Sequence, residues 1–310
     1  MLRLIRNVGI LKHLSLYIPL KTLDQLYKIF VRPHLDYCDI IYHIPPNHND
    51  FDSSLSLNNS MEMIEKVQYQ AAMAITGTWQ GTNRNKLYEE LGWESLSDRR
   101  WSRRLFQFFK IQNGLTPSYL TECVPRLRRP LYQNTILNSH HEFRCRTSLF
   151  KYSFFPSTVI SWNNLESVTR NCLSIRSFKQ HLLPLIRPKS RQIFGIHDCL
   201  GIKRLFQLRV GLSALKSHKY RHNFQDTQSD LCDCRTNVED TEHYLLHCPL
   251  FSSMRHSLIN SINIVLNNYR NMNPTINSDL LLYGHNSLSS DENKNILLST
   301  IKFIKESNRL

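Results

Sequence analysis

Apolar side chains recur three or four positions apart along most of the chain, which is the spacing of one face of a helix. The pattern predicts helices over residues 22–30, 64–76, 99–113, 174–183 and 201–222. It returns from residue 252 to residue 310, where an Asn-rich linker at 267–278 interrupts it. Residues 45–60 read as a loop, 124–145 as irregular, and 154–162 as a short strand or turn. Because strand patterns are sparse, the sequence predicts a mainly α fold.

Turn-forming residues mark the ends of several predicted helices. Pro33 is expected to bend or end the first helix, because proline lacks the backbone donor that a helix needs. Gly77 is expected to follow the second helix as its C-terminal cap. Ser97 or Asp98 would cap the start of the third helix, and Gly114 would end it.

The charge of the chain is concentrated in two blocks. The 310 residues carry 39 Lys and Arg against 25 Asp and Glu, a formal charge of +14. Residues 99–151 hold eleven basic and two acidic residues, or +9, and residues 170–222 hold twelve and one, or +11. The rest of the chain is therefore net negative. Such concentration favours a polyanionic partner.

Several classes of protein are excluded at this stage. No apolar run approaches the ~18–20 residues that span a bilayer, so no membrane partner is expected. Arg6, Lys12 and His13 interrupt any apolar core of a signal peptide, so the chain is not expected to be secreted. A basic, amphipathic mitochondrial transit peptide stays an alternative. Eight cysteines without a secretion signal indicate a reducing compartment.

The predicted third helix separates apolar from basic side chains. One face is expected to carry Trp101, Leu105, Phe108 and Phe109. The opposite side would carry Arg99, Arg103 and Lys110, with Arg100 and Arg104 at its flank. Arginine matches phosphate oxygens with a planar, two-pronged donor set, so this helix is a candidate nucleic-acid surface. The alternative is an ordinary solvated helix face.

The second basic block is less regular. Its apolar stripe consists of Leu205, Leu208, Leu212 and Leu215. Arg204 and Lys219 lie near that stripe, which is typical of long basic side chains that lie along an apolar surface. Together the predicted phosphate contacts are Arg99, Arg100, Arg103, Arg104, Lys110, Arg144, Arg146, Lys203, Arg204 and Arg209.

Cysteine and histidine form the sharpest chemical motif. Cys232 and Cys234 are followed after eight residues by His243 and after four more by Cys248. Thiolates and an imidazole in a group of four are what a structural Zn²⁺ requires. Asp240 or Thr241 could cap a short helix that carries His243, and His247 is an alternative fourth ligand. The other interpretation is a set of ordinary buried thiols.

No catalytic constellation is present. The sequence lacks the G-x-x-x-x-G-K-[ST], G-x-S-x-G and H-E-x-x-H motifs. The run from Tyr37 to Ile40 has one aspartate, Asp39, where two-metal polymerase chemistry needs paired carboxylates. The chain by itself is therefore not expected to be an enzyme.

Short motifs in a fixed order resemble a known family. Leu91-Gly92-Trp93-Glu94-Ser95-Leu96, Arg99-Arg100 and Phe109-Lys110-Ile111-Gln112-Asn113-Gly114-Leu115 resemble the region after the palm in reverse transcriptases of non-LTR (LINE-type, jockey-like) retrotransposons. Further similar segments follow the same order: Val31 to Tyr37, Ile64 to Gln68, Arg146-Thr147, Ser153 to Thr158, Trp162 to Leu165 and Ser177 to Lys179. Leu231 to Cys234, Glu239 to His243 and Cys248 to Leu250 resemble the family's cysteine–histidine element.

The resemblance implies a helical thumb-like region, a basic linker and a small helical, zinc-binding C-terminal element. It implies binding to RNA or DNA during target-primed reverse transcription, in a nuclear or cytoplasmic ribonucleoprotein. The palm with its aspartates would lie upstream of this chain in the full-length parent. One departure is Arg235, because the family usually has glycine at this position. Glycine there eases the positive φ of a turn around the metal.

These inferences predict three regions: a helical thumb-like region at 1–120, an irregular basic connector at 121–199, and a C-terminal helical region with the zinc element at 200–310. The expected function is that of a non-catalytic C-terminal fragment of an RNA-directed DNA polymerase. The alternatives are a host-retained, zinc-containing scaffold that binds protein, and a product without function from a truncated element.

Overall fold

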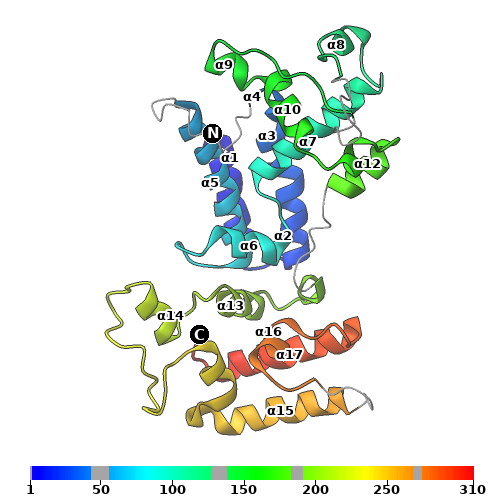
Figure 1. The fold of residues 1–310 in the computed structure, drawn as a ribbon. Coiled ribbons are helices and arrows are strands. Elements are labelled where there is room, and N and C mark those ends of the chain that lie inside the picture. The colour runs from blue at the N-terminus through cyan, green and yellow to red at the C-terminus, as the bar shows by residue number, and fades with distance from the viewer. Residues whose placement is uncertain (1, 43–55, 128–137, 183–190, 268–273) are drawn as a thin grey trace. The chain divides into compact units, whose positions relative to one another are not determined.

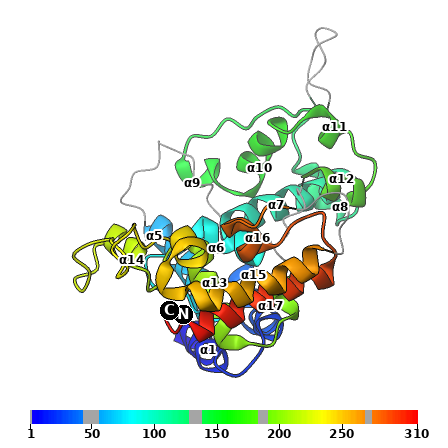
Figure 2. The same ribbon diagram turned by 90° about the horizontal axis from the view of Figure 1, so that it is seen from below.

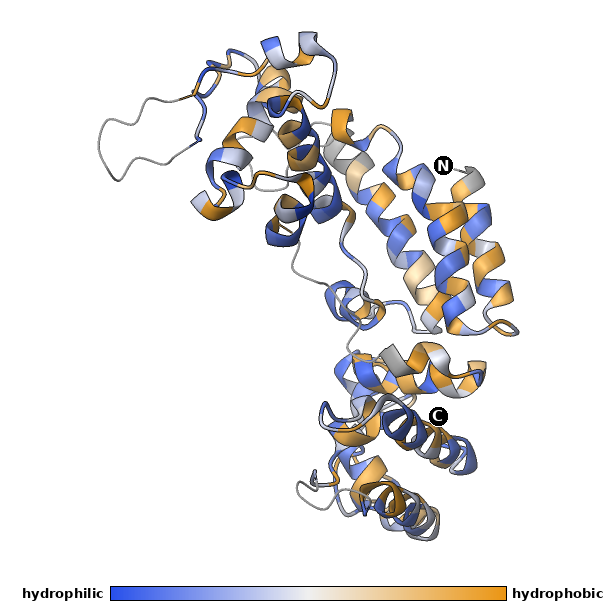
Figure 3. Ribbon diagram, turned by 90° about the vertical axis from the view of Figure 1, so that its right-hand side faces the viewer, coloured by the Kyte–Doolittle hydropathy of each residue, from blue (hydrophilic) through white to orange (hydrophobic). Residues whose placement is uncertain are grey.

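The computed structural model describes residues 2–42, 56–127, 138–182, 191–267 and 274–310, and these are mainly helical (Figure 1). Within these ranges the only extended pairings are two isolated antiparallel bridges, Leu127 with His140 and Leu231 with Val238. Apolar and polar positions alternate around the helices, as the hydropathy colouring in Figure 3 shows. The mainly α fold predicted from apolar spacing is therefore confirmed.

The chain forms two compact units built from interleaved segments. Unit 1 comprises Met1–Arg32, Val67–Trp93 and Arg187–Leu310. Unit 2 comprises Pro33–Lys66 and Glu94–Ile186. The three consecutive regions 1–120, 121–199 and 200–310 stay a prediction, since the compact units follow contacts between distant segments.

Two helices belong to both units, α3 (Arg32–Asp36) and α5 (Ser56–Thr76). The other helical elements of unit 1 are α1 (Leu2–Leu14), α2 (Leu20–Leu26), η1 (Tyr27–Val31), α6 (Arg84–Leu91), η2 (Arg191–Gly195), α13 (Cys199–Val210), α14 (Lys216–Arg221), η3 (His243–His247), η4 (Pro249–Phe251), α15 (Ser252–Leu266), α16 (Ser278–Tyr283) and α17 (Ser290–Glu306). Those of unit 2 are α4 (Asp39–Tyr42), α7 (Leu96–Gln112), α8 (Ser118–Glu122), α9 (Ser148–Lys151), α10 (Phe154–Asn163), α11 (Ser167–Arg170) and α12 (Ile175–Leu182).

An aromatic pair joins the first two segments of unit 1, Met1–Arg32 and Val67–Trp93. The ring of Tyr27 stacks on Trp93 with a centroid separation of 3.9 Å, and its hydroxyl donates to Gln68 Oε1 at 2.7 Å. Trp93 Nε1 in turn donates to Asp24 Oδ1 at 2.8 Å. Both aromatic side chains are buried, so their polar ends need these acceptors.

The C-terminal part of unit 1 packs around α17. This helix begins with a capping box between Ser289 and Glu292 and contacts α13, α15 and α16. Figure 2 shows α15 and α17 side by side. The buried face of α17 is formed by Asn293, Ile296, Leu297, Thr300, Ile301, Phe303 and Ile304.

Three helices, α7, α10 and α12, form the core of unit 2. Phe178 of α12 stacks on Phe109 of α7 at 4.7 Å and on Trp162 of α10 at 5.4 Å, measured between ring centroids. Leu105, Phe108, Val159 and Leu182 complete this cluster. Such offset stacking adds to the hydrophobic burial of the large rings.

The structure corrects three sequence predictions of local structure. Residues 154–162 form the helix α10 and not a strand or turn, because Pro156 lies in the first turn, where its missing N–H is tolerated. The predicted helix over 201–222 is two helices, because Gly211 adopts φ +74° and caps α13. Ser95, and not Ser97 or Asp98, caps α7 by accepting from the backbone N–H of Asp98.

A buried ion pair links α6, α13 and α16 inside unit 1. Arg209 Nη1 donates to Glu90 Oε2 at 3.2 Å, and Arg209 Nε donates to the Leu282 carbonyl at 2.9 Å. Tyr283 donates to Glu90 Oε1 at 3.0 Å, and its ring centroid lies 4.7 Å from the Arg209 guanidinium. Both charges are fully enclosed, so each depends on the other for compensation.

We expect Glu90→Gln to lower the free energy of unfolding by about 3 kcal/mol, because it leaves the buried Arg209 without a counter-charge. The matched control is Glu306→Gln, which breaks the exposed pair with Lys302 and should cost less than about 0.5 kcal/mol. Urea denaturation of both variants measures the difference. Equal losses in the two variants would contradict the role assigned to the buried pair.

Candidate metal centre

A short hairpin carries the first two candidate ligands. Its arms meet at the bridge between Leu231 and Val238, and the N–H of Cys232 donates to the Asn237 carbonyl at 2.9 Å. The N–H of Glu239 donates to the Asp230 carbonyl at 2.8 Å and closes the base of the hairpin. Cys232 and Cys234 therefore lie on one turn that is held by its own backbone hydrogen bonds.

Arg235 occupies a left-handed backbone position in this turn. Its φ is +60°, and its N–H donates to the Cys232 carbonyl at 2.9 Å. A residue with a Cβ is strained there, whereas glycine is not. The departure from glycine noted in the sequence therefore falls at the one position of the turn where φ is positive.

A helical turn carries the other two candidate ligands. Asp240 Oδ1 accepts the N–H of His243 at 2.7 Å and so caps the start of this turn, which makes Asp240 the cap of the two that the sequence offered. Residues His243–His247 then form a single turn with wider, π-type bonding. Its last bond runs from the N–H of Cys248 to the His243 carbonyl at 2.7 Å, after which Cys248 leaves the helix. Such turns are frequent at functional sites.

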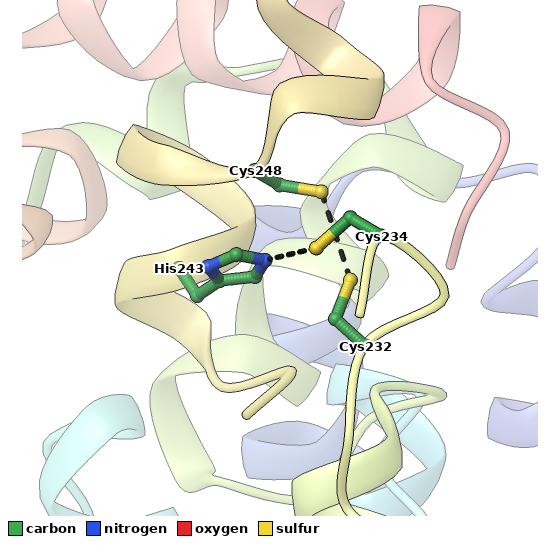
Figure 4. Close-up of side chains that lie close together, drawn as sticks. All are labelled: Cys232, Cys234, His243 and Cys248. Carbon is green, nitrogen blue, oxygen red and sulfur yellow. Dashed lines mark hydrogen bonds between the residues drawn. The ribbon is translucent and has the colours of Figure 1, made fainter. Parts of the chain in front are cut away.

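The four side chains point toward one another (Figure 4). Their ligand atoms all lie within 4.8 Å of one another. The sulfurs of Cys232 and Cys248 are 3.6 Å apart, and Cys234 Sγ lies 3.2 Å from His243 Nε2. In a tetrahedral zinc site with bonds of about 2.3 Å to sulfur and about 2.05 Å to nitrogen, two sulfurs lie about 3.8 Å apart. A sulfur and a nitrogen lie about 3.6 Å apart. The arrangement can hold a metal ion after small shifts of these side chains.

His247 lies outside this cluster. Its side chain is exposed, and its Nε2 lies 3.9 Å from Glu242 Oε1. The metal-ligand group instead contains Cys248, which is buried. The structure therefore selects Cys248 over the alternative ligand that the sequence left open.

The thiols differ in how easily they ionise. Burial raises the pKa of the Cys232 thiol to about 12. Burial opposes ionisation of Cys234 too, but hydrogen bonds with Thr236, Cys232 and His243 outweigh it and lower the pKa of this thiol to about 6. Since metals bind thiolates, loading the cluster must release protons. Metal affinity is therefore expected to fall as the pH falls.

Arg255 of α15 holds the turn that carries His243 and Cys248. This buried guanidinium donates to the carbonyls of Leu245 at 2.9 Å, Cys248 at 2.7 Å and Tyr244 at 3.3 Å. It thus satisfies carbonyls at the end of the helical turn, where no further helical N–H is present. Nothing in the spacing of the ligands pointed to Arg255, because its partners are main-chain oxygens.

Glu239 holds the hairpin to the rest of unit 1. Its carboxylate forms a two-pronged pair with Arg309, in which Nε donates to Oε1 at 2.6 Å and Nη2 donates to Oε2. Oε2 also accepts the N–H of Lys216 at the start of α14 at 2.8 Å. A second pair joins Lys216 Nζ to Asp233 Oδ1 at 2.6 Å, within the C-x-C turn. The acidic residues of this segment are therefore structural partners of nearby bases.

The predicted phosphate contacts on α7 are largely engaged inside unit 2. Arg99 pairs with the Asp36 carboxylate through both Nε and Nη2. Arg103 Nη1 donates to Asp39 Oδ2 at 3.0 Å. Arg104 is buried and donates to the Ile40 carbonyl at 3.1 Å.

Arg100 and Arg104 are interior, and Trp101 is 36% exposed, so their predicted positions on the helix wheel are wrong. The physical reason is that α4 and α10 pack against the face of α7 that contains Leu96, Arg100, Arg104 and Phe108.

The other predicted phosphate contacts differ in exposure. Arg144 and Arg146 are exposed, and Lys110, Lys203 and Arg204 are half-buried. Lys203 Nζ donates to Ser15 Oγ at 3.0 Å. Arg209 is enclosed in its pair with Glu90, which removes it from the surface.

Comparison of the chain with protein-family models, with curated proteins and with solved structures finds no match. Within the described ranges, no helix combines the length and the apolar content that crossing a membrane requires.

We expect the buried His218 to make unit 1 less stable in mild acid. Burial, with the positive charge of Arg221 adding to it, lowers the pKa of this imidazole to about 4. Its ring nitrogens lie 2.8 Å from Ser213 Oγ and 3.4 Å from Thr241 Oγ1. Between pH 6.5 and 4 the unfolded chain binds a proton that the folded chain does not, so stability falls as the pH falls.

Relative to His218→Gln, which cannot titrate, the wild type should lose on the order of 3 kcal/mol between pH 7 and pH 4. The measurement is chemical denaturation of both proteins across this pH range. Parallel pH profiles for the two proteins would refute the assignment.

Proposed function

We propose that this chain is the non-catalytic C-terminal part of a non-LTR retrotransposon reverse transcriptase, which binds RNA or DNA and holds one structural zinc ion. The observation that carries the proposal is the convergence of Cys232, Cys234, His243 and Cys248, the residues of the element that resembles the end of such polymerases. The ordered motifs from residue 31 to residue 250 support the same family.

The donor set favours zinc over other metals. Three thiolates and one imidazole are soft and borderline ligands, which suit Zn²⁺ and are poor partners for Mg²⁺ or Ca²⁺. Four protein ligands complete a tetrahedral shell and leave no open position for a substrate or water. The role that follows is structural: the ion joins the hairpin of Cys232 and Cys234 to the turn that leads into α15.

The zinc element is a weak candidate for phosphate binding. Its segment is acidic, with Asp226, Asp230, Asp233, Glu239, Asp240 and Glu242. Three nearby bases already pair with these acids: Lys216 with Asp233, Lys219 with Asp226 and Arg309 with Glu239. A phosphate would meet repulsion here, so we assign nucleic-acid binding to unit 2.

Within unit 2, the segment around Arg144 and Arg146 best fits a nucleic-acid surface. Both arginines are exposed, unlike Arg100 and Arg104 on α7. Phe150 follows at the start of α9 and is 44% exposed, which offers an aromatic face on which a base can stack. Exposed guanidinium groups and a partly exposed aromatic ring within one short segment suit a single strand.

Zinc analysis tests the metal assignment. The purified chain should contain about one Zn²⁺, and Cys232→Ser/Cys248→Ser should contain none, because two of four ligands are lost. The control is Cys145→Ser/Cys199→Ser, which changes two cysteines outside the cluster and should keep the metal. A wild-type chain that is folded without metal would refute the structural zinc.

Nucleic-acid binding tests the other part of the proposal. Arg144→Gln/Arg146→Gln should weaken binding to single-stranded RNA about tenfold and reduce the slope of log affinity against log salt by about 1.4, or about 0.7 per lost phosphate contact. The control Lys21→Gln/Lys302→Gln removes the same charge from exposed sites of unit 1 and should leave the slope unchanged.

An unchanged salt slope in the arginine variant would reject this surface. Absence of RNA and DNA binding by the wild type, together with a protein partner retained at high salt, would instead favour the zinc-containing scaffold. Fluorescence anisotropy of labelled RNA and DNA at several salt concentrations measures both the affinity for nucleic acid and its salt slope.

A further inference from the structure

Unit 2 contains a cavity that the proposed function does not use. Its volume is about 390 Å³, and it lies beside the aromatic core, with Phe109 and Trp162 in its wall. This volume is within the usual range for small-molecule sites. The lining also contains Asn171, Leu173 and the charged side chain of Arg170, but no acidic residue.

Arg170 is a buried cation without a counter-charge among the described residues. It is 5% exposed, and burial alone lowers its pKa, with no carboxylate opposing the shift. Nη1 donates to the Asn163 carbonyl at 2.8 Å, whereas Nε makes no hydrogen bond to a described group. Nε has almost no accessible surface, so a ligand in the cavity must meet the guanidinium through another of its donors. A buried cation without a carboxylate is costly unless an anion compensates its charge.

Two other buried arginines have more acceptors than Arg170, whereas Arg100 likewise keeps Nε and Nη2 without a partner among the described groups. Arg209 has the Glu90 carboxylate and the Leu282 carbonyl, and Arg255 has three backbone carbonyls. Arg170 has one carbonyl, and in addition it lines a cavity. Because Arg170 lines the cavity, an anion bound there can compensate its charge.

The neighbouring polar groups leave a further donor at the cavity. Asn138 Nδ2 donates to Asn171 Oδ1 at 2.6 Å, which leaves the amide N–H groups of Asn171 available. His140 Nδ1 lies 2.7 Å from the Pro125 carbonyl, and its Nε2 contacts the Gln112 amide, so this ring is already satisfied. The lining therefore offers donors from Arg170 and Asn171 and no competing negative charge.

We propose that this cavity is an oxyanion site in which Arg170, assisted by Asn171, binds a phosphate monoester group. A planar guanidinium matches the oxygens of phosphate, and the aromatic wall is suited to the sugar or base of a nucleotide. The proposal stands apart from the proposed function, because it requires neither zinc nor the surface at Arg144 and Arg146.

Titration calorimetry of the full-length chain tests the site with three probes: inorganic phosphate, adenosine 5′-monophosphate, and a 5′-phosphorylated oligonucleotide compared with its 5′-hydroxyl form. All titrations are run at one ionic strength, so that screening is constant. Saturable binding by the wild type is expected for inorganic phosphate. Tighter binding of the nucleotide identifies a small ligand, and a preference for the phosphorylated oligonucleotide identifies a strand end.

The variants separate ligand binding from a structural role of Arg170. Arg170→Gln should weaken phosphate binding at least about tenfold, as the loss of a charge-assisted bond predicts. The control Arg176→Gln removes an exposed arginine of the same unit and should bind like the wild type.

A second variant covers the case in which Arg170→Gln fails to fold. Leu173 lines the cavity and is 96% exposed, so Leu173→Glu should fold normally while its carboxylate repels the anion. We expect binding about tenfold weaker than in the neutral control Leu173→Gln. No saturable binding of any probe, or equal affinity in Leu173→Glu and Leu173→Gln, would overturn the proposal.

Discussion

The enclosure of arginine side chains is the constraint on which both units depend. Carbonyl and carboxylate oxygens stabilise a buried guanidinium, and a basic, helical chain has few acids to offer. Arg100, buried with Nε and Nη2 unpartnered among the described groups, shows that this need is not always met. Arg209 meets this need with Glu90 and the end of α16, and Arg104 meets it with the Ile40 carbonyl and Ser157 Oγ. These contacts join segments that are far apart in the sequence, a role that strand pairing has in other folds.

The same constraint explains the metal centre. Its hairpin has a single bridge, and its helical turn is one turn long, so neither would hold its ligands in place alone. Arg255 fixes the carbonyls of the turn, and the pair of Glu239 with Arg309 fixes the hairpin. Two thiols at 3.6 Å then face each other in a buried site, where a metal ion removes the cost of ionising them.

The division of charge gives the two units different chemistry. In unit 1, Lys216, Lys219 and Arg309 are paired with acids of the cysteine–histidine segment. In unit 2, the arginines of α7 are paired or buried, while Arg144 and Arg146 remain exposed and Arg170 lies beside a cavity. Net charge by itself therefore does not show which basic side chains are exposed and which are paired or buried.

The sequence by itself determined the helical character of the chain and predicted the candidate metal-ligand group, because both follow from spacings of a few residues. It left open His247 against Cys248 and Thr241 against Asp240, which the structure decided. It predicted the C-terminal cap at Gly77, which has φ +67°, for the same local reason. Only the tertiary structure decided that Arg100 and Arg104 are interior and that Arg255 supports the metal centre. Their positions depend on elements that pack from distant parts of the sequence, and helical periodicity contains no information about that packing.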